Sequence, residues 1–348
     1  MATDDDSARG LTPEEALEQG RWVKLICGAS NQDLPAIADL SAVYSAAGVH
    51  CVDVAADPAV IRAARIGLDW AEKLASRRPW LMVSLSDGAD PHFRKAWFDP
   101  QRCPADCPRP CARVCPADAI PLAAGVDPER CYGCGRCLPA CPLGLITEHE
   151  HQLPITAMAE LLRVERPDAV EIHTTPARTV EFAAVVEALA ASQLPLRRLA
   201  VSCGLEGHSV DREGLALALW RRHSLLRRHR FRALWQLDGR PMRGDLGVGT
   251  SRAAVQLWRS LQPLAPPGPL QLAGGTNAAT IGHLASDERP AGVAFGGMAR
   301  RLLQPLLREA QQRGTSLREW PDGWSEAVTI ARGLVEPWCA RPSVDASC

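Results

Sequence analysis

Short apolar segments alternate with longer amphipathic segments along most of the chain. The short segments have the composition of buried strands, and the longer ones repeat apolar residues every three or four positions, as helices covering a sheet do. Strands are predicted at residues 22–29, 49–55, 80–86, 169–174, 196–203, 232–238, 270–275 and 292–296. Helices are predicted between them, among others at 34–47, 58–75, 180–191, 215–228, 251–261 and 298–311.

This alternation predicts a parallel sheet, and eight units of about 30 residues each are typical of a closed (β/α)8 barrel of the TIM type. An open doubly wound sheet is the alternative. The barrel is predicted over 21–97 and 152–313, with an insert over 98–151 after the third strand. A flexible N-terminal extension, 1–20, and a C-terminal extension, 314–348, flank it. The insert is expected on the carboxyl-terminal face, where such barrels bind ligands.

The insert holds eight of the 13 cysteines, in two quartets that each end in Cys-Pro. The second quartet has the spacing of a bacterial [4Fe–4S] ferredoxin motif and consists of Cys131, Cys134, Cys137 and Cys141. Gly133 and Gly135 let the backbone curl around a cluster. The first quartet has one extra residue in each of its first two gaps and consists of Cys103, Cys107, Cys111 and Cys115.

In ferredoxins with two clusters, the fourth cysteine of each motif binds the other cluster. On that pattern, one [4Fe–4S] cluster is assigned to Cys103, Cys107, Cys111 and Cys141. The other is assigned to Cys131, Cys134, Cys137 and Cys115. Closed zinc sites are the alternative, because zinc also takes four thiolates, although it does not need the Cys-Pro endings. The sequence leaves open whether the clusters transfer electrons or only stabilise the fold.

Two glycine pairs follow the seventh and eighth predicted strands, Gly274 with Gly275 and Gly296 with Gly297. Glycines there permit close approach of the backbone to a phosphate, and the following helix contributes free N–H groups. The two loops resemble the phosphate site of FMN-dependent barrel oxidoreductases. The alternative is that they are turns that close the barrel without a ligand.

Polar side chains also stand in or just after otherwise apolar strands. They are Lys24, Asp53, Asp57, His173 and Asp238. Their positions near strand ends are consistent with a ligand pocket. The alternative is structural, with Lys24 and Asp53 as an ion pair and His173 as a hydrogen-bonded core residue.

Composition and charge exclude several classes of protein. The 348 residues include 39 Lys and Arg against 40 Asp and Glu, and 5% are aromatic, so no nucleic-acid partner is expected. No apolar run reaches the length of a membrane span and no secretion signal is recognised, so we expect a cytoplasmic protein. One basic run predicts either a solvated helix face or a docking face for an acidic redox partner. It consists of Arg221, Arg222, His223, Arg227, Arg228, His229, Arg230 and Arg232.

The strings KLICGAS at 24–30 and CVDVAADP at 51–58, followed by the two Cys-Pro quartets, resemble the cyanobacterial light-dependent period (LdpA) family. The resemblance runs over most of the chain. It implies an iron–sulfur protein that senses cellular redox state as a proxy for light, adjusts the circadian period and associates with clock proteins. The eight cluster cysteines would carry that function. The alternative function is a flavin-dependent oxidoreductase fed by the two clusters, and the sequence leaves catalytic turnover open.

Overall fold

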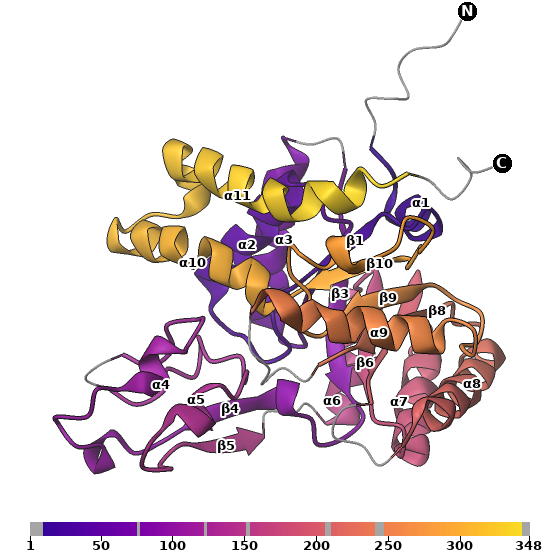
Figure 1. Cartoon of the computed structure of the whole chain (residues 1–348), viewed down its shortest axis with the longest axis horizontal. Coiled ribbons are helices and arrows are strands. Elements are labelled where there is room, and N and C mark those ends of the chain that lie inside the picture. The colour runs from indigo at the N-terminus through magenta and orange to yellow at the C-terminus, as the bar shows by residue number, and fades with distance from the viewer. Residues whose placement is uncertain are drawn as a thin grey trace, which may run out of the picture.

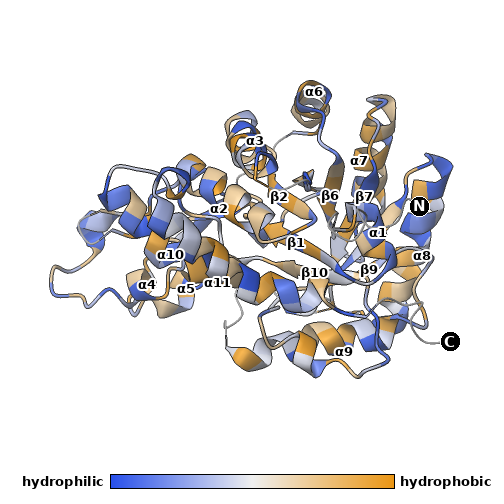
Figure 2. Cartoon of the chain, turned by 90° about the horizontal axis from the view of Figure 1, so that it is seen from above, coloured by the Kyte–Doolittle hydropathy of each residue, from blue (hydrophilic) through white to orange (hydrophobic). Residues whose placement is uncertain are grey.

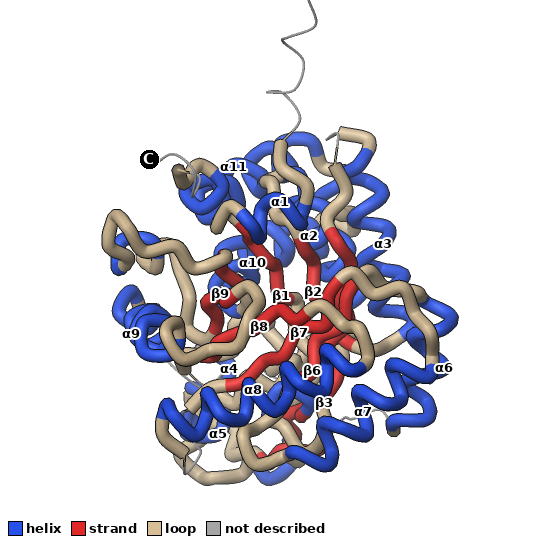
Figure 3. Tube along the Cα trace, turned by 90° about the vertical axis from the view of Figure 1, so that its right-hand side faces the viewer, coloured by secondary structure: helices blue, strands red, loops and turns tan. Residues whose placement is uncertain are grey.

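The computed structural model describes residues 10–74, 77–121, 124–150, 154–205, 210–240 and 247–342. The outer ends of both predicted extensions and His151, the last residue of the predicted insert, lie outside this description. Eight parallel strands form a closed barrel inside a layer of helices (Figure 3). In ring order they are β1 (Trp22–Ile26), β2 (Cys51–Ala55), β3 (Trp80–Ser86), β6 (Ala169–His173), β7 (Arg198–Cys203), β8 (Ala233–Asp238), β9 (Leu270–Ala273) and β10 (Gly292–Phe295). All eight predicted strands are confirmed, and the closed ring excludes the open sheet.

Helices cover the outside of the barrel and carry both hydrophilic and hydrophobic residues (Figure 2). They are α2 (Leu34–Ala46), α3 (Pro58–Glu72), α6 (Ile155–Glu165), α7 (Thr179–Ala191), α8 (Arg212–Arg228), α9 (Arg252–Leu261), α10 (Gly297–Gln312) and α11 (Pro321–Cys339). The six predicted helices are confirmed, although the predicted end of α3 at residue 75 lies outside the described residues. The predicted C-terminal extension forms α11, which packs on α2 and α10. No helix in the described part of the chain is long and apolar enough to cross a membrane.

Part of the predicted N-terminal extension is a packed helix, α1 (Pro13–Glu18). It begins with a capping box, in which Thr12 and Glu15 each accept a backbone N–H of the other. Its Leu17 is buried beside Trp22 at the amino-terminal end of the barrel. The apolar face of this stretch therefore closes one end of the core, and flexibility stays a prediction for the extension.

The insert leaves the barrel after β3 and returns before α6. An antiparallel pair, β4 (Arg94–Trp97) and β5 (Thr147–Glu150), joins its two ends. This stem, which the sequence did not predict, holds a loop with two short helices, α4 (Pro110–Arg113) and α5 (Cys137–Ala140). Figure 1 shows stem and loop away from α1, on the side where the barrel strands end.

The barrel interior changes from apolar to polar along its axis. Every second residue of a strand points inward, because side chains alternate between the two faces. The inward residues near the amino-terminal end form an apolar cluster of Trp22, Cys51, Trp80, Met82, Ala169, Ala200 and Leu234. Those farther along are Lys24, Asp53, Ser84, Glu171, His173, Ser202, Gln236 and Asp238. The polar layer therefore lies directly under the mouth of the barrel.

Lys24 is the centre of a fully buried charge cluster. Its Nζ donates to Glu171 and lies 3.7 Å from Asp53 Oδ2. Burial disfavours the charge on Lys24, but the two carboxylates outweigh it and raise the pKa of the amine. Burial also opposes the charge on Glu171, yet Lys24 and His173 lower the pKa of that carboxyl to about 2. The predicted pair of Lys24 with Asp53 exists, but the direct bond of Lys24 goes to Glu171.

Replacing Lys24 by Met should destabilise the fold by about 3–5 kcal/mol, because it leaves buried carboxylates without their cation. The measurement is anaerobic urea unfolding followed by circular dichroism. The control is Arg313→Met, which removes the exposed pair with Glu309 and the stacking of the guanidinium on Trp320 and should cost about 1 kcal/mol. The double variant K24M/E171Q should lose less than the sum of the two single variants. A K24M protein as stable as R313M would contradict this account.

Candidate metal centre and barrel-mouth cavity

Four thiols of the insert surround one small cavity. They belong to Cys115, Cys131, Cys134 and Cys137. Ala96 of β4 and Ile120 supply apolar wall around them. Burial raises the pKa of Cys115 to about 11, so this thiol holds its proton at neutral pH until a metal displaces it. Four convergent thiols in an apolar setting are a donor set that fits a metal centre.

The other four cysteines of the insert also lie near one another. Cys103 is hydrogen-bonded to Cys107 and lies within electrostatic reach of Cys141, while Cys111 lies within reach of Cys103 and Cys141. Cys141 directly follows α5, so the chain passes from one set to the other across this short helix. The structure thus brings together both predicted sets, including the exchange of Cys115 and Cys141 between the quartets.

Backbone N–H groups point at several of these sulfur atoms. Ala96 donates to Cys131 Sγ over 3.3 Å, and Ala119 donates to Cys115 Sγ over 3.3 Å. Burial opposes ionisation of Cys141, but N–H groups within residues 143–146 outweigh it and lower the pKa of that thiol. Such donors stabilise thiolates, and they help to set the potential of an iron–sulfur cluster. The surroundings of the sulfur atoms therefore fit the predicted clusters.

Two glycines shape the loop between these cysteines, as the sequence predicts. Gly133 and Gly135 have φ values of +70° and +69°. A Cβ on Gly133 would lie 2.0 Å from the carbonyl oxygen of Arg94, because β4 passes directly against the loop. Gly144 also has a positive φ, +59°, but open space surrounds it. Position 133 thus requires glycine for both its conformation and its packing.

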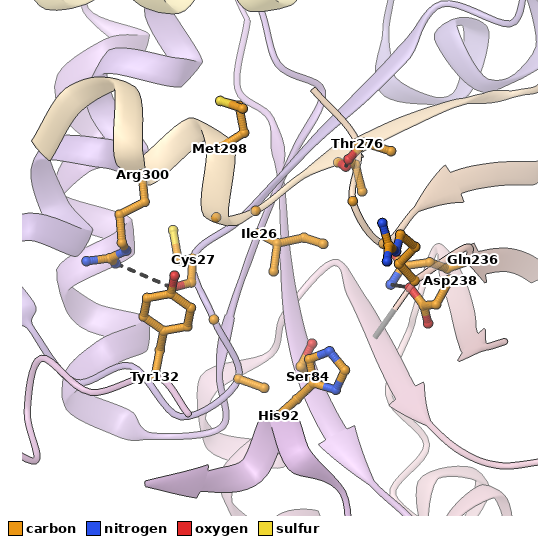
Figure 4. Close-up of a pocket in the computed structure, with 18 of the residues that line it drawn as sticks. Ile26, Cys27, Ser84, His92, Tyr132, Gln236, Asp238, Thr276, Met298 and Arg300 are labelled. Atoms are coloured by element: carbon orange, nitrogen blue, oxygen red, sulfur yellow. Dashed lines mark hydrogen bonds between the residues drawn. The ribbon is translucent and has the colours of Figure 1, made fainter. Parts of the chain in front are cut away.

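A cavity of about 110 Å³ lies between the barrel mouth and the insert, several times the space that one water molecule needs (Figure 4). The barrel contributes Ser84, Gln236 and Asp238. The insert contributes Tyr132 and Arg136. Since Tyr132 stands between two of the predicted cluster ligands in the sequence, the cavity and the thiol site share a wall.

Tyr132 is held between the loop after β1 and helix α10. The guanidinium of Arg300 lies 5.4 Å from the centre of its ring and donates to the carbonyl of Cys27 over 3.4 Å. On the other side, a Cβ on Gly28 would lie 3.0 Å from Tyr132 Cβ, and Gly28 has a φ of +104°. The insert is therefore in direct contact with the barrel at this tyrosine.

The four glycines predicted to bind a phosphate or FMN all line this cavity. Gly274 and Gly275 have φ values of +70° and +84°, and a Cβ on Gly274 would lie 2.6 Å from the carbonyl oxygen of Arg240. Backbone geometry alone explains this first pair. Gly296 has space for a side chain, and Gly297 begins α10. A phosphate role for these loops stays a prediction.

The polar residues predicted to mark a ligand pocket separate into three groups. His173 and Asp238 line the cavity. Lys24 and Asp53 lie deeper, in the buried charge cluster. Asp57 begins α3 by accepting two backbone N–H groups, so its role is helix capping.

Sequence reasoning missed several groups at the cavity. They are His92, Arg136, Arg240, Arg300 and Gln236. Gln236 and the buried Glu171 each stand two residues before a residue that was singled out, Asp238 and His173. The period of two along a strand could have found them. His92 and the arginines come from loops and helices whose mutual positions no local pattern shows.

The basic run on α8 is only partly a surface feature. Arg222 is 4% exposed, donates to Thr174 Oγ1 over 3.1 Å and stacks on Phe182, so it does not belong to a docking face. Arg232 is exposed but paired with Glu14. The other exposed arginines of the run are Arg221, Arg227, Arg228 and Arg230. Figures 1 and 2 show α8 across the barrel from α4 and α5.

Comparison with known families identifies the insert. The profile described as "LdpA Fe-S cluster-binding domain" matches residues 103–152, and "Light dependent period A C-terminal domain" matches residues 161–337. The chain is also 47% identical to "Light dependent period A" of Synechococcus elongatus, over 93% of each protein. The first matched region contains all eight predicted cluster cysteines, so the insert is an iron–sulfur cluster-binding domain.

Two solved structures resemble the chain in fold. Tryptophan synthase of Mycobacterium tuberculosis is 13% identical, with a TM-score of 0.44, over 92% of this chain and 95% of that chain. (S)-3-O-geranylgeranylglyceryl phosphate synthase of Thermoplasma acidophilum is 13% identical, with a TM-score of 0.40, over 94% of this chain and 99% of that chain. Similarities this low carry no information on function.

Gly133→Ala should remove about half of the bound iron and sulfide, because both the conformation and the contact with β4 exclude a Cβ from this cluster loop. Gly144→Ala is the matched control. An alanine at 144 must adopt the left-handed conformation, at a cost of about 1–2 kcal/mol, but its Cβ has open space around it. This variant should therefore keep its full content of iron and sulfide. Iron and sulfide are measured on anaerobically purified protein. Equal contents in the two variants would contradict the packing argument.

Proposed function

Because the chain belongs to the light-dependent period A family, we propose that it senses the redox state of the cell, as a proxy for light, and adjusts the circadian period. The observation that carries this proposal is the gathering of eight insert thiols into two sets of four. A bound iron–sulfur cluster supplies a redox couple whose potential depends on charge, hydrogen bonds to sulfur and exposure. The redox sensor is the preferred function, and the proposal does not require catalytic turnover.

Two [4Fe–4S] clusters, one per set, form the proposed cofactor content. The environments of the two sets differ. Cys131, Cys134 and Cys137 are buried, whereas Cys103 and Cys107 are partly exposed. The outer set, which contains Cys103, is the one that external oxidants and reductants reach first. The inner set shares its wall with the barrel through Tyr132 and is the one that passes the signal on.

Helix α10 is the element through which the barrel responds to the clusters. It contacts the inner cluster loop where Arg300 stacks on Tyr132. It also holds the insert through Arg308 and Gln304, which both donate to Asp118. A change in the charge of a bound cluster, or its loss, would act on both contacts, because Tyr132 and Asp118 each lie within three residues of a predicted ligand. Movement or loosening of α10 then changes the outer surface of the barrel.

The alternative function, an FMN-dependent oxidoreductase fed by the clusters, rests on the four glycines at the mouth. The comparisons lend it no support. The positive φ values of Gly274 and Gly275 also account for that pair without a ligand. The sensor is therefore the better supported of the two functions.

Clock proteins and a redox partner are the proposed partners, and the cytoplasm is the proposed location. A reducing compartment keeps thiols available for clusters. The exposed arginines of α8 supply a positive face for an acidic partner. Because α8 lies across the barrel from the insert, a partner bound there leaves the outer cluster accessible.

The crossed ligand assignment predicts which cysteine variants behave alike. Cys115→Ala should lose the same cluster as Cys131→Ala, and Cys141→Ala the same cluster as Cys103→Ala, with about half of the iron missing in each. EPR spectra of the reduced proteins identify the lost signal, and acid extracts of the same samples report any flavin. Cys339→Ala, outside both sets, is the control. If C115A instead matched C103A, the crossing would be wrong.

Reversing two charges on α8 tests the partner face. In Synechococcus elongatus lacking its own relative, the double variant R227E/R228E should restore the light response of the circadian period less well than the unchanged chain. Its iron content should stay normal, because α8 is remote from the insert. The control is R163E on α6, where an exposed arginine pairs with Glu160 of the same helix. Full rescue by R227E/R228E would show that the exposed arginines of α8 are a solvated surface that binds no partner.

A further inference from the structure

We propose that Asp90, His92 and His173 form a binding site for one divalent transition metal ion, zinc or ferrous iron, at the mouth of the barrel. Each side chain brings a donor atom to within 4.8 Å of the other two. Two imidazoles and one carboxylate bind such ions in proteins where further coordination positions stay open. The three residues are separate from the eight thiols of the clusters.

The segment that carries two of these donors has a defined conformation. Asp90 precedes a single turn of 3₁₀ helix, Pro91–Phe93, and its Oδ1 accepts the backbone N–H of His92 over 2.8 Å. The same oxygen lies 2.7 Å from His92 Nδ1. Asp90 is 7% exposed, so its carboxylate is held against the ring. The two donors are therefore positioned by the turn itself.

Contacts with the end of β6 fix this segment against the third donor. The N–H of Asp87 donates to the carbonyl of His173 over 3.3 Å. Arg178 donates to Asp87 Oδ1 over 2.9 Å and to the carbonyl of Ala89. The ring centres of His92 and His173 lie 4.8 Å apart. Donors from two distant parts of the chain are thus held within 4.8 Å of one another, close enough for small side-chain shifts to bring them onto one ion.

A buried carboxylate stands behind the third donor. His173 Nε2 lies 3.1 Å from Glu171 Oε1. The other ring nitrogen, Nδ1, takes no part in this bond and is the atom that would bind the metal. Glu171 is itself held by Lys24 and Gln236. Histidines that bind metals commonly donate their second ring nitrogen to a carboxylate, which fixes the tautomer and the orientation of the ring.

The open side of the site faces the cavity. His92 and His173 both line it, together with Ser84 and Asp238, and Figure 4 draws His92 and Ser84 among its lining residues. A small ligand in the cavity can therefore complete the coordination of the ion. The competing account is a proton in place of the metal. Burial opposes a charge on His173, but Glu171 and Asp90 outweigh it and raise the pKa of this ring to about 9.

Zinc binding to the cluster-loaded chain separates the two accounts. Zinc is the probe because the clusters already contain iron. Equilibrium dialysis under anaerobic conditions, with zinc measured by mass spectrometry, should find one zinc ion per chain in the unchanged protein. Asp90→Asn and His92→Gln should each weaken this binding by about tenfold or more. Asn can still accept the N–H of His92, so D90N keeps the turn.

The control is His149→Gln, which changes a histidine of β5 that packs on Trp97. It should bind zinc as the unchanged protein does. Iron and sulfide must be equal in all samples, so that zinc in vacant cysteine sites is excluded and a failure of the clusters is distinguishable from a failure of this site. The proposal would be overturned in favour of the proton by less than half a zinc ion per chain in the unchanged protein. Zinc binding by D90N and H92Q as tight as that of the unchanged protein would also overturn it.

Discussion

The contact between the cluster loop and the barrel is the constraint on which the rest of the structure depends. Gly133 admits the carbonyl of Arg94 at a distance that excludes a Cβ. Gly28 admits Tyr132 at close contact and has a φ of +104°, which disfavours any other residue. These two close approaches bring the inner thiols to the wall of the mouth cavity. Without them the insert would still be held through pairs such as Asp118 with Arg308, but its inner thiols would lie away from the wall of the cavity.

The buried charges under the mouth impose a second constraint on the same region. Charged groups such as Lys24, Glu171 and Asp53 cannot be left unpaired in a core. The three strands that carry them must therefore keep their register, so that these charges stay paired. Glu171 then orients His173, and Gln236 bonds both Glu171 and Ser202. These bonds hold the barrel side of the cavity in place, whereas the opposite side consists of insert residues such as Tyr132. A signal that passes between insert and barrel is therefore expected to move the insert side.

Local sequence patterns predicted the barrel because its strands are buried on both faces and its helices are amphipathic. They predicted the thiol sets because cluster ligands follow one another at short, regular spacing. The stem escaped prediction, since β4 contains Arg94 and Lys95 and β5 contains Glu148 and Glu150, which hide the strand pattern. The cavity escaped for another reason. Its arginines and His92 converge only after the ring has closed, and no spacing along the chain encodes that convergence.

The short antiparallel stem of β4 and β5 has a consequence for how the protein arose and how it fails. Paired strands lie about 5 Å apart, so β4 and β5 bring the two ends of the insert as close together as the ends of a tight turn. A domain attached in this way can be gained or lost in evolution without rearranging its host. By the same reasoning, the insert can unfold when its clusters are destroyed while the ring of eight parallel strands stays closed.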